Sequence, residues 1–192
     1  MRQTSSILST WLIIILFFVL LFTLYNQQNK KYDDKGKDAS IPTQLHPIVE
    51  EHKNKLVKEA ENIGIELIIT ETIRSYDEQN ALYEQGRTTE GNIVTHAQGG
   101  ESYHNYGLAI DYALSDQDGN LIWDLNYDGN GNGDSDWFEV ADIAKDLGFE
   151  WGGDWEKFQD YPHLQMTFGL SIRDLQNGLR PKTEQGVEEV DN

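Results

Sequence analysis

Two short polar stretches, each joined to an alternating apolar pattern, constrain the fold more than any other feature of the sequence. Residues 102–111 read Ser-Tyr-His-Asn-Tyr-Gly-Leu-Ala-Ile-Asp and contain His104 and Asp111. The Asn-Tyr-Gly break after the histidine can reorient the chain. Beyond that break, alternation along a strand places Ala109 and Asp111 on one face and the neighbouring apolar residues on the other. We therefore expect Asp111 to point away from the core, into a site.

The second stretch, residues 160–163, lies about fifty residues further on and shows the same alternation. His163 and Gln165 share one face of a predicted strand, and the residues between and after them face the core. Pro162 disfavours helical conformation at the residue before it, so Asp160 enters from a loop. Both stretches are thus expected to direct polar side chains toward a common place.

The residue types in these stretches suit a metal centre. Two imidazoles and one carboxylate, from His104, His163 and Asp111, can bind zinc and leave a fourth position open. Asp160 is then available as the general base that takes a proton from water. The alternative interpretation is a surface His–Asp hydrogen bond, which residue types alone would favour. Two stretches with matching alternation favour the metal site.

Two more residues are candidates for this site. Arg74, expected to be exposed just after the first strand of the domain, can stabilise an oxyanion or bind a substrate carboxylate. Ser102 is expected to orient backbone or ligand rather than to act as a nucleophile, because the sequence positions no base for it. Trp155, in a Trp/Gly-rich turn, is a candidate for the wall of a substrate groove.

The pattern of helices and strands predicts an α+β domain with a small antiparallel sheet and flanking helices. The apolar spacing and turn residues first predict a helix over 47–63, a buried strand over 65–70 and a helix capped by Asp77 that stops at Gly86. A strand over 108–114 with a hairpin partner at 120–124 is expected next. The predicted elements that follow are a helix over 137–147, a strand over 163–168 and a last helix within 171–179.

The N-terminal part of the chain differs in character from the rest. Residues 7–25 are nearly all apolar, which predicts a transmembrane anchor after a short tail at 1–6. A polar linker at 26–44, the domain at 45–180 and an acidic, disordered tail at 181–192 are expected to follow. A cleaved signal peptide is the alternative, although no small-residue cleavage site follows the apolar run.

Charge and composition limit the possible partners. The formal net charge is −18 and no basic stripe is present, which argues against nucleic acid as a partner. The chain contains no cysteine, so disulfides and thiolate ligands are excluded. Lysines after the apolar run would place the domain in the cytoplasm by the positive-inside rule. The chemistry expected of the site instead places a monomeric domain outside a bacterial cell membrane.

The two stretches together resemble a known peptidase superfamily. The pattern Ser-x-His-x-x-Gly-x-Ala-x-Asp, followed by an acidic residue three before a second histidine, is similar to the zinc D,D-peptidase and L-alanyl-D-glutamate endopeptidase superfamily. That superfamily includes vancomycin-resistance D,D-peptidases, phage endolysins and bacillus cell-wall peptidases, and shares its fold with the Hedgehog signalling domain. The resemblance covers about residues 45–178 and has no departure from the pattern.

The resemblance implies zinc on His104, Asp111 and His163, with Asp160 as the catalytic acid and base. The segment 73–87 looks like the family's substrate-arginine segment, which places Arg74 in the site; the substrate-binding residues expected are Gln79, Ser102, Tyr106, Trp155 and Gln165. The implied activity is hydrolysis of the L-Ala–D-Glu bond in peptidoglycan stem peptides. The alternatives are a D,D-carboxypeptidase that removes terminal D-Ala and a non-catalytic wall-binding module.

Residues 128–139 match a second metal pattern that the resemblance does not explain. They read Asp-Gly-Asn-Gly-Asn-Gly-Asp-Ser-Asp-Trp-Phe-Glu, which fits the twelve-residue calcium loop with glycine at position 6 and glutamate at position 12. The expected ligands are Asp128, Asn130, Asn132, the carbonyl of Asp134, Asp136 and Glu139. Serine stands at position 8 and no entering helix is apparent. An ordinary Asn/Gly-rich turn is the alternative.

Overall fold

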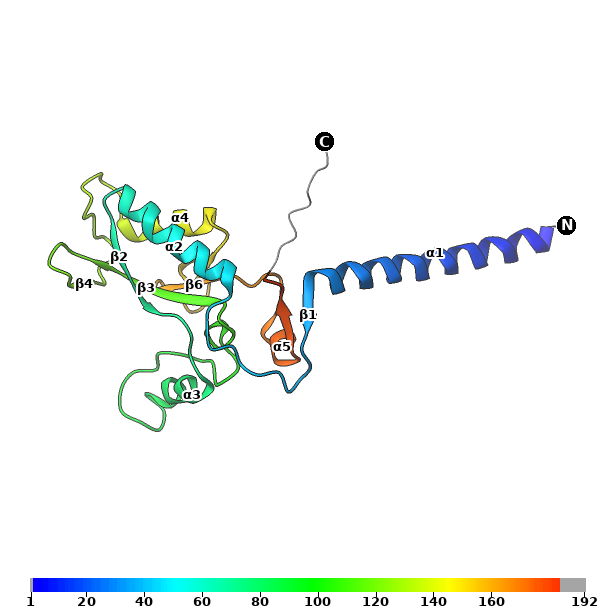
Figure 1. The fold of residues 1–192 in the computed structure, drawn as a ribbon, viewed down its shortest axis with the longest axis horizontal. Helices are drawn as coiled ribbons and strands as arrows, with labels where there is room; N and C mark the ends of the chain where they lie inside the picture. Colours follow the sequence, from blue (N-terminus) through cyan, green and yellow to red (C-terminus); the bar gives the residue numbers. More distant parts are fainter. Residues whose placement is uncertain (1, 184–192) are drawn as a thin grey trace.

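The computed structural model describes residues 2–183, and Figure 1 shows their arrangement. The elements in chain order are α1 (Arg2–Lys31), β1 (Tyr32–Asp34), α2 (Pro47–Asn62), β2 (Glu66–Glu71), α3 (Tyr76–Glu84), η1 (Tyr103–Tyr106), β3 (Ala109–Ser115), β4 (Leu121–Ile122), α4 (Asp136–Asp146), β5 (Glu150–Trp151), η2 (Gly152–Asp154), β6 (His163–Gln165), α5 (Ile172–Gln176) and β7 (Leu179–Pro181). The main sheet has the order β2-β3-β6-β5, with β4 paired to β3, and every pairing in it is antiparallel. The predicted α+β class is confirmed.

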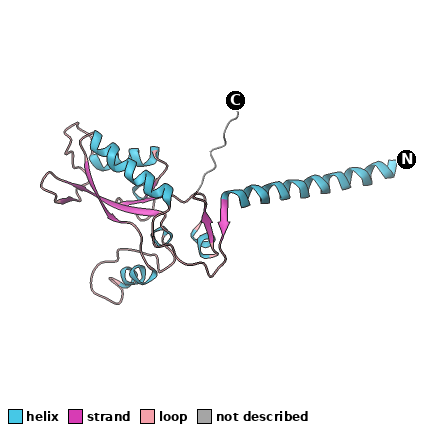
Figure 2. Ribbon diagram, viewed as in Figure 1, coloured by secondary structure: helices cyan, strands magenta, loops and turns pink. Residues whose placement is uncertain are grey.

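Helices α2 and α4 lie against one face of the main sheet, while α3 lies on the other side (Figures 1 and 2). Each covering helix buries one stripe of apolar residues, although Phe138 of α4 lies outside that stripe and is exposed. The core between helices and sheet includes Leu56, Ala60, Val140, Ala144, Ile110, Leu114 and Leu164. The core therefore fills one side of the sheet and leaves the other side free for polar groups.

The ends of the predicted helices follow from local capping. Helix α2 covers all but the last residue of the predicted range, with Pro47 at its first turn, where a missing amide proton costs nothing. The predicted cap of α3 was wrong: Ser75, not Asp77, is the N-cap, and it forms a capping box with Glu78. The Ser75 side chain accepts a hydrogen bond from the Glu78 backbone N–H, and the Glu78 side chain accepts one from the Ser75 backbone N–H. A single cap at Asp77 would not form this reciprocal pair.

The strand predicted as buried lies at the edge of the sheet. Strand β2 pairs only with β3, and its residues alternate between exposed and half-buried. The prediction of full burial was wrong because an apolar run alone does not tell a central strand from an edge strand. The pairing also shifts between Ile69 and Glu71, so that Glu71 comes opposite Asp111.

The segment that follows α1 meets the end of the domain in a second, two-stranded sheet. Strand β1 pairs antiparallel with β7, so Tyr32 lies opposite Pro181. The segment 26–44, predicted as a polar linker, thus includes the end of α1 and a strand that pairs with the end of the domain. Most of the predicted acidic tail, residues 184–192, lies outside the described residues.

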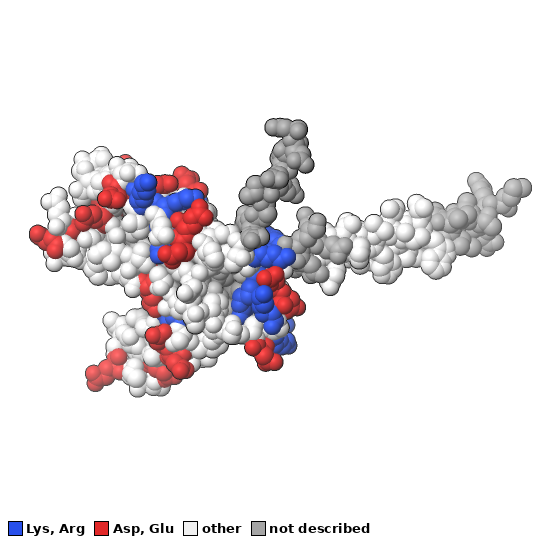
Figure 3. Space-filling model, in the orientation of Figure 1, with Lys and Arg blue, Asp and Glu red and all other residues white. Residues whose placement is uncertain are grey.

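The predicted anchor segment 7–25 lies within the long helix α1, which extends away from the domain (Figure 1). Figure 3 shows the uncharged surface of its middle part beside the many acidic side chains of the domain. Among the residues whose side chains the structure describes, which in α1 are 11–25 and Lys31, no helix is both long and apolar enough to cross a bilayer.

Gly107, between η1 and β3, has a backbone conformation and a close contact that a substitution can test. Its φ is +67°, and a Cβ there would lie 2.5 Å from the Gln44 carbonyl oxygen. Gly119 has a similar φ of +81° but open space around it. We expect Gly119→Ala to lower the free energy of unfolding by about 1 kcal/mol through backbone strain. Gly107→Ala should lower it by about 1–3 kcal/mol more because of the clash.

Denaturant unfolding followed by tryptophan fluorescence measures both variants. Equal losses of stability in the two would show that the contact with Gln44 does not constrain residue 107.

Candidate metal centre

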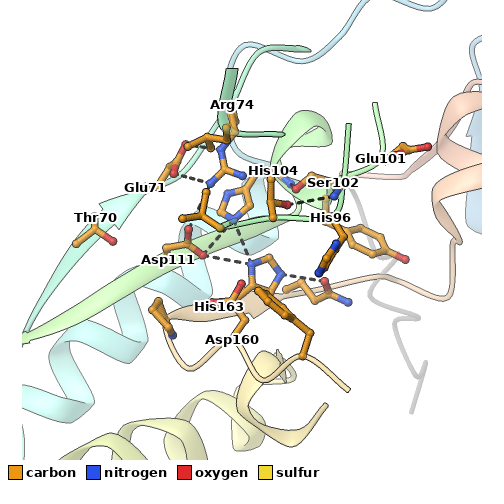
Figure 4. A pocket seen from close by; sticks show the side chains of 18 of the residues that line it. Thr70, Glu71, Arg74, His96, Glu101, Ser102, His104, Asp111, Asp160 and His163 are labelled. Atoms are coloured by element: carbon orange, nitrogen blue, oxygen red, sulfur yellow. Dashed lines mark hydrogen bonds and ion pairs between the residues drawn. The ribbon is translucent and has the colours of Figure 1, made fainter. Parts of the chain in front are cut away.

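Three side chains from separate parts of the chain converge on one point beside the main sheet (Figure 4). His104 comes from η1, Asp111 from β3 and His163 from β6, and the register of β3 with β6 sets Asp111 directly opposite His163. The Nε2 atom of His104 lies 3.1 Å from Oδ1 of Asp111 and 3.2 Å from Nδ1 of His163. The third side of the triangle, from His163 Nδ1 to Asp111 Oδ1, is 3.2 Å.

The other nitrogen of each imidazole is held by an oxygen acceptor. Nδ1 of His104 lies 2.7 Å from the carbonyl oxygen of Thr72, and Nε2 of His163 lies 3.0 Å from Oε1 of Gln165. Each of these nitrogens must donate its proton to that oxygen. In the neutral imidazoles, the nitrogens that face Asp111 therefore carry lone pairs.

This arrangement fits a zinc ion by both chemistry and spacing. Two nitrogen lone pairs and a carboxylate oxygen face one another with no proton between them, and a cation satisfies all three. Tetrahedral zinc with bonds of about 2.0–2.1 Å places its ligand atoms about 3.3 Å apart, close to the separations seen here. Among the described residues, this is the only group of three histidine, aspartate or glutamate ligand atoms within 4.8 Å of one another.

The charge state of Asp111 also suits a ligand. Burial by itself would raise the pKa of its carboxyl, but when the imidazoles of His104 and His163 are protonated, their hydrogen bonds and charge outweigh that effect and bring the pKa far below its usual range. The carboxylate therefore stays ionised near neutral pH, as metal binding requires. Its second oxygen, Oδ2, lies 3.5 Å from the Arg74 guanidinium.

Arg74 is buried, contrary to the expectation that it is exposed. Its side chain forms a two-point ion pair with Glu71, with Nε 2.6 Å and Nη2 2.5 Å from the two carboxylate oxygens. Nη1 donates to Gln79 at 2.8 Å. A buried guanidinium needs such partners, and an exposed one does not. Arg74 is consequently fixed beside Asp111, at the edge of the cavity.

Asp160 lies close to His163, at the start of the turn that leads into β6 (Figure 4). Burial raises the pKa of its carboxyl above the ordinary value, and the charges of His163, His104 and Arg74 offset this only in part. A Cβ on Gly152 would collide with the Asp160 carbonyl oxygen and lie 3.1 Å from the Cβ of His163. Only glycine at 152 lets the η2 turn pack this closely behind both residues.

A cavity of about 570 Å³ opens above the triangle. Its lining includes Thr70, His96, Ser102, Trp123, Trp155 and Asp160. The indole of Trp155 lies 5.2 Å from the His163 ring, measured between centroids. Ser102 and Trp155 thus both line the cavity, and their contact with substrate stays a prediction.

The other residues expected to bind substrate are committed to neighbouring protein groups. Gln79 is fully buried and donates to the Ala97 carbonyl while it accepts from Arg74. The Tyr106 hydroxyl donates to the Gly100 carbonyl, and the side chain is buried. Gln165 lines the cavity, yet its amide joins His163 to Glu150. These three residues position the site.

Sequence reasoning missed several residues of this site. Glu71, the Thr72 carbonyl and Gly152 have no motif around them, and each acts through another residue. Trp123 and His96 reach the cavity from a hairpin and a loop whose paths only the folded chain sets. Of these residues, only Glu71 has a signal in the sequence, because it is a charged residue at the end of an apolar strand pattern.

The calcium-loop residues lie away from this cavity, between β4 and α4. Within the described part of the chain, their acidic side chains do not form a second group of three ligand atoms as tightly clustered as the triangle. Two of the six expected ligand groups are amide side chains and one is a backbone carbonyl.

Comparison with known proteins places this geometry among peptidoglycan peptidases. A family profile described as D-alanyl-D-alanine carboxypeptidase matches residues 95–166. The chain is 57% identical over 152 residues to the peptidoglycan L-alanyl-D-glutamate endopeptidase CwlK of Bacillus subtilis, covering 79% of this chain and 91% of that protein. It is 35% identical to the L-alanyl-D-glutamate peptidase of Listeria phage A118, covering 59% of this chain and 35% of the phage protein.

Among solved structures, the L,D-carboxypeptidase DacB from Streptococcus pneumoniae is similar to this chain. The TM-score is 0.49 at 22% sequence identity, over 77% of this chain and 84% of that chain.

The Gln165 amide provides a test of how the site is held together. Gln165→Met keeps the size of the side chain but removes the acceptor for the His163 Nε2 proton. We expect zinc affinity to fall by about 10-fold, because such outer partners fix the orientation of a ligand imidazole. Gln117→Met, in the exposed turn after β3, is the matched control and should bind zinc as the wild type does.

Zinc affinity is measured by competition with a chromophoric chelator. Unchanged affinity in Gln165→Met would show that the His163 ring is oriented without this hydrogen bond.

Proposed function

The chain belongs to the M15 family of zinc peptidases, and from this we propose that it is an endopeptidase that hydrolyses the L-Ala–D-Glu bond of peptidoglycan stem peptides. The observation that carries the proposal is the triangle of His104, Asp111 and His163, in which both imidazoles present a lone pair to one point. The names of the Bacillus and phage relatives support the choice of bond.

Different residues of the chain have different roles in hydrolysis. Zinc held by the three ligands supplies Lewis acidity that activates a water molecule and polarises the scissile carbonyl. Asp160 accepts a proton from the attacking water and returns it to the amine nitrogen as the C–N bond breaks. The raised pKa of Asp160 suits both steps, because a carboxylate with an ordinary pKa is a weaker base and a poorer store for the proton.

Arg74 has a positioning role in this proposal. Its ion pair with Glu71 and its contact with Asp111 Oδ2 hold the carboxylate so that Oδ1 faces the two imidazoles. One guanidinium proton, on Nη1, is not used in these contacts or in the bond to Gln79, and because Arg74 lines the cavity this proton can bind a substrate carboxylate or the developing oxyanion. Ser102 and Trp155, which line the same cavity, are proposed to contact the peptide on either side of the ligands.

Product analysis tests the choice of bond. The zinc-loaded full chain is incubated with purified muropeptides, and the products are identified by mass spectrometry. New stem peptides that begin with D-Glu are expected. Loss of a single terminal D-Ala would instead assign D,D-carboxypeptidase activity, and absence of any cleavage by zinc-loaded protein would favour a wall-binding module.

Asp160→Asn tests the role of the base. The neutral amide cannot accept the proton, so kcat should fall by about 10²–10⁴-fold while one zinc ion per chain stays bound. Asp154→Asn, the same change at an exposed residue of η2, is the matched control and should leave kcat unchanged. Measurable cleavage by Asp160→Asn at a rate near that of the wild type would contradict the assignment.

We also propose that residues 7–25 attach the enzyme to the bacterial cell membrane as a single-pass anchor, with the domain outside the cell. The support is that this segment lies in one helix and that its apolar side chains from Trp11 to Tyr25 are 38–66% exposed. An apolar helix surface of this kind gains free energy when it moves from water into hydrocarbon.

Membrane fractionation tests the anchor. Two glutamates introduced by Leu16→Glu and Leu20→Glu should move the protein from the carbonate-washed membrane pellet to the supernatant, because charges at the centre of a bilayer are costly. Lys35→Glu with Lys37→Glu introduces the same residues outside the segment and should leave the protein in the pellet. Protection of the domain from protease added to intact protoplasts would contradict the proposed orientation.

A further inference from the structure

The loop between β4 and α4 turns its last acidic side chain back onto its first half. Both carboxylate oxygens of Glu139 are engaged, with Oε2 3.0 Å from the Asn130 amide nitrogen and Oε1 2.7 Å from the Asn132 amide nitrogen. In the twelve-residue pattern these are positions 12, 3 and 5. A glutamate at position 12 that faces positions 3 and 5 with both oxygens has the placement of a bidentate calcium ligand.

The first carboxylate of the loop organises the backbone around itself. Asp128 accepts backbone N–H bonds from Gly131 at 2.7 Å, Asn132 at 3.1 Å and Gly133 at 3.0 Å. Gly133, at position 6 of the pattern, has φ +97°, and a Cβ there would meet only open space, so its requirement is conformational and not steric. The loop thus makes the sharp turn of a calcium loop around its position 1.

Asp136 supplies an independent observation that points to a ligand. Its side chain is 1% exposed, and Oδ2 accepts a bond from the Gly129 amide at 3.0 Å, which turns the carboxylate toward the start of the loop. Oδ1 is buried and has no hydrogen-bond partner among the described residues. A buried carboxylate oxygen without a partner costs considerable free energy.

The surroundings of Asp136 show what kind of partner is missing. Burial raises the pKa of its carboxyl, and the nearby carboxylates of Glu139 and Asp128 raise it further, while backbone N–H groups at 129 and 130 act in the opposite direction. Asp128 and Glu139 lie close enough to Asp136 for their charges to act on it, and among the described salt bridges no Lys or Arg side chain is paired with any of the three. A cation is the partner that such a group lacks.

We propose that loop 128–139 is a second metal site, separate from the zinc centre, that binds one calcium ion. The ligands are the side chains of Asp128, Asn130, Asn132, Asp136 and Glu139 and the carbonyl of Asp134. All are oxygen donors, which a hard cation prefers over the nitrogen donors of the zinc centre. Rotation of the two amide groups turns their oxygens toward Glu139, and the cation lies between them.

The site would have a structural role at one wall of the active-site cavity. Asp136 begins α4, and the next residue, Trp137, is buried with its ring 5.0 Å from that of Tyr112 on β3. Trp137 also lies 6.2 Å from Trp123, which lines the cavity. Calcium bound at the start of α4 thus fixes the residues against which the cavity wall packs.

Calcium binding is tested on the zinc-loaded full chain, in buffer freed of calcium by resin so that no chelator removes zinc. Calcium at 100-fold above its Kd should raise Tm by about 5 °C. Terbium, a luminescent substitute for calcium, should show emission sensitised by Trp137, and added calcium should displace it. Binding is measured without substrate, so its outcome is independent of whether the proposed peptide bond is cleaved.

Variants assign the effect to this loop. Glu139→Gln and Asp136→Asn should each lose at least 10-fold in calcium affinity and lose the Tm shift. Glu59→Gln, the same chemical change on the exposed face of α2, should behave as the wild type. Circular dichroism of each variant shows whether it folds, and the wild-type titration decides the matter if one does not.

Three outcomes would overturn the proposal. They are the absence of both a Tm shift and terbium emission in the wild type, an equal Tm shift in Glu139→Gln, and an equal response to magnesium at the same concentration. The last outcome would replace a calcium site by a nonspecific effect of divalent cations on an acidic protein.

Discussion

The structure depends on the antiparallel register of β3 with β6. That register sets Asp111 opposite His163 and Ala109 opposite Gln165. A one-residue slip of β6 would turn His163 into the core and bring Leu164 out to the cavity, and a slip of β3 would do the same to Asp111 and Ile110. Burial of these two apolar residues against α2 and α4 therefore fixes the metal ligands indirectly, because the wrong register would expose the core.

Around the ligands, each polar group is held by another that does not touch the metal position. Thr72 and Gln165 fix the two imidazoles, and Arg74 with Glu71 fixes the carboxylate. Because Arg74 and Gln165 are buried, a bond lost at either of them leaves an unpaired polar group in a low-dielectric region. The outer groups thus make the site rigid. They keep the two imidazole nitrogens and the carboxylate oxygen close together beside a cavity that is open to solvent.

The proposed calcium loop and the zinc centre are associated with different faces of the sheet. The zinc ligands use the face opposite the covering helices, and the loop leads into α4, one of those helices. Trp137 and Tyr112 join the two regions through the core. The β1–β7 pairing adds a third constraint, since it connects the end of α1 to the end of the domain.

The sequence by itself determined the α+β class, most helix positions and that His104, Asp111 and His163 gather at one site near Asp160, because alternation and capping are local and these residue types carry their own chemistry. It did not determine that β2 is an edge strand, that Arg74 is buried or that Gln79 and Tyr106 support the site from behind. Those facts depend on which residues meet across the fold. Glu71, Thr72 and Gly152 acquire their roles only through contacts with residues distant in sequence, and only the tertiary structure decides such contacts.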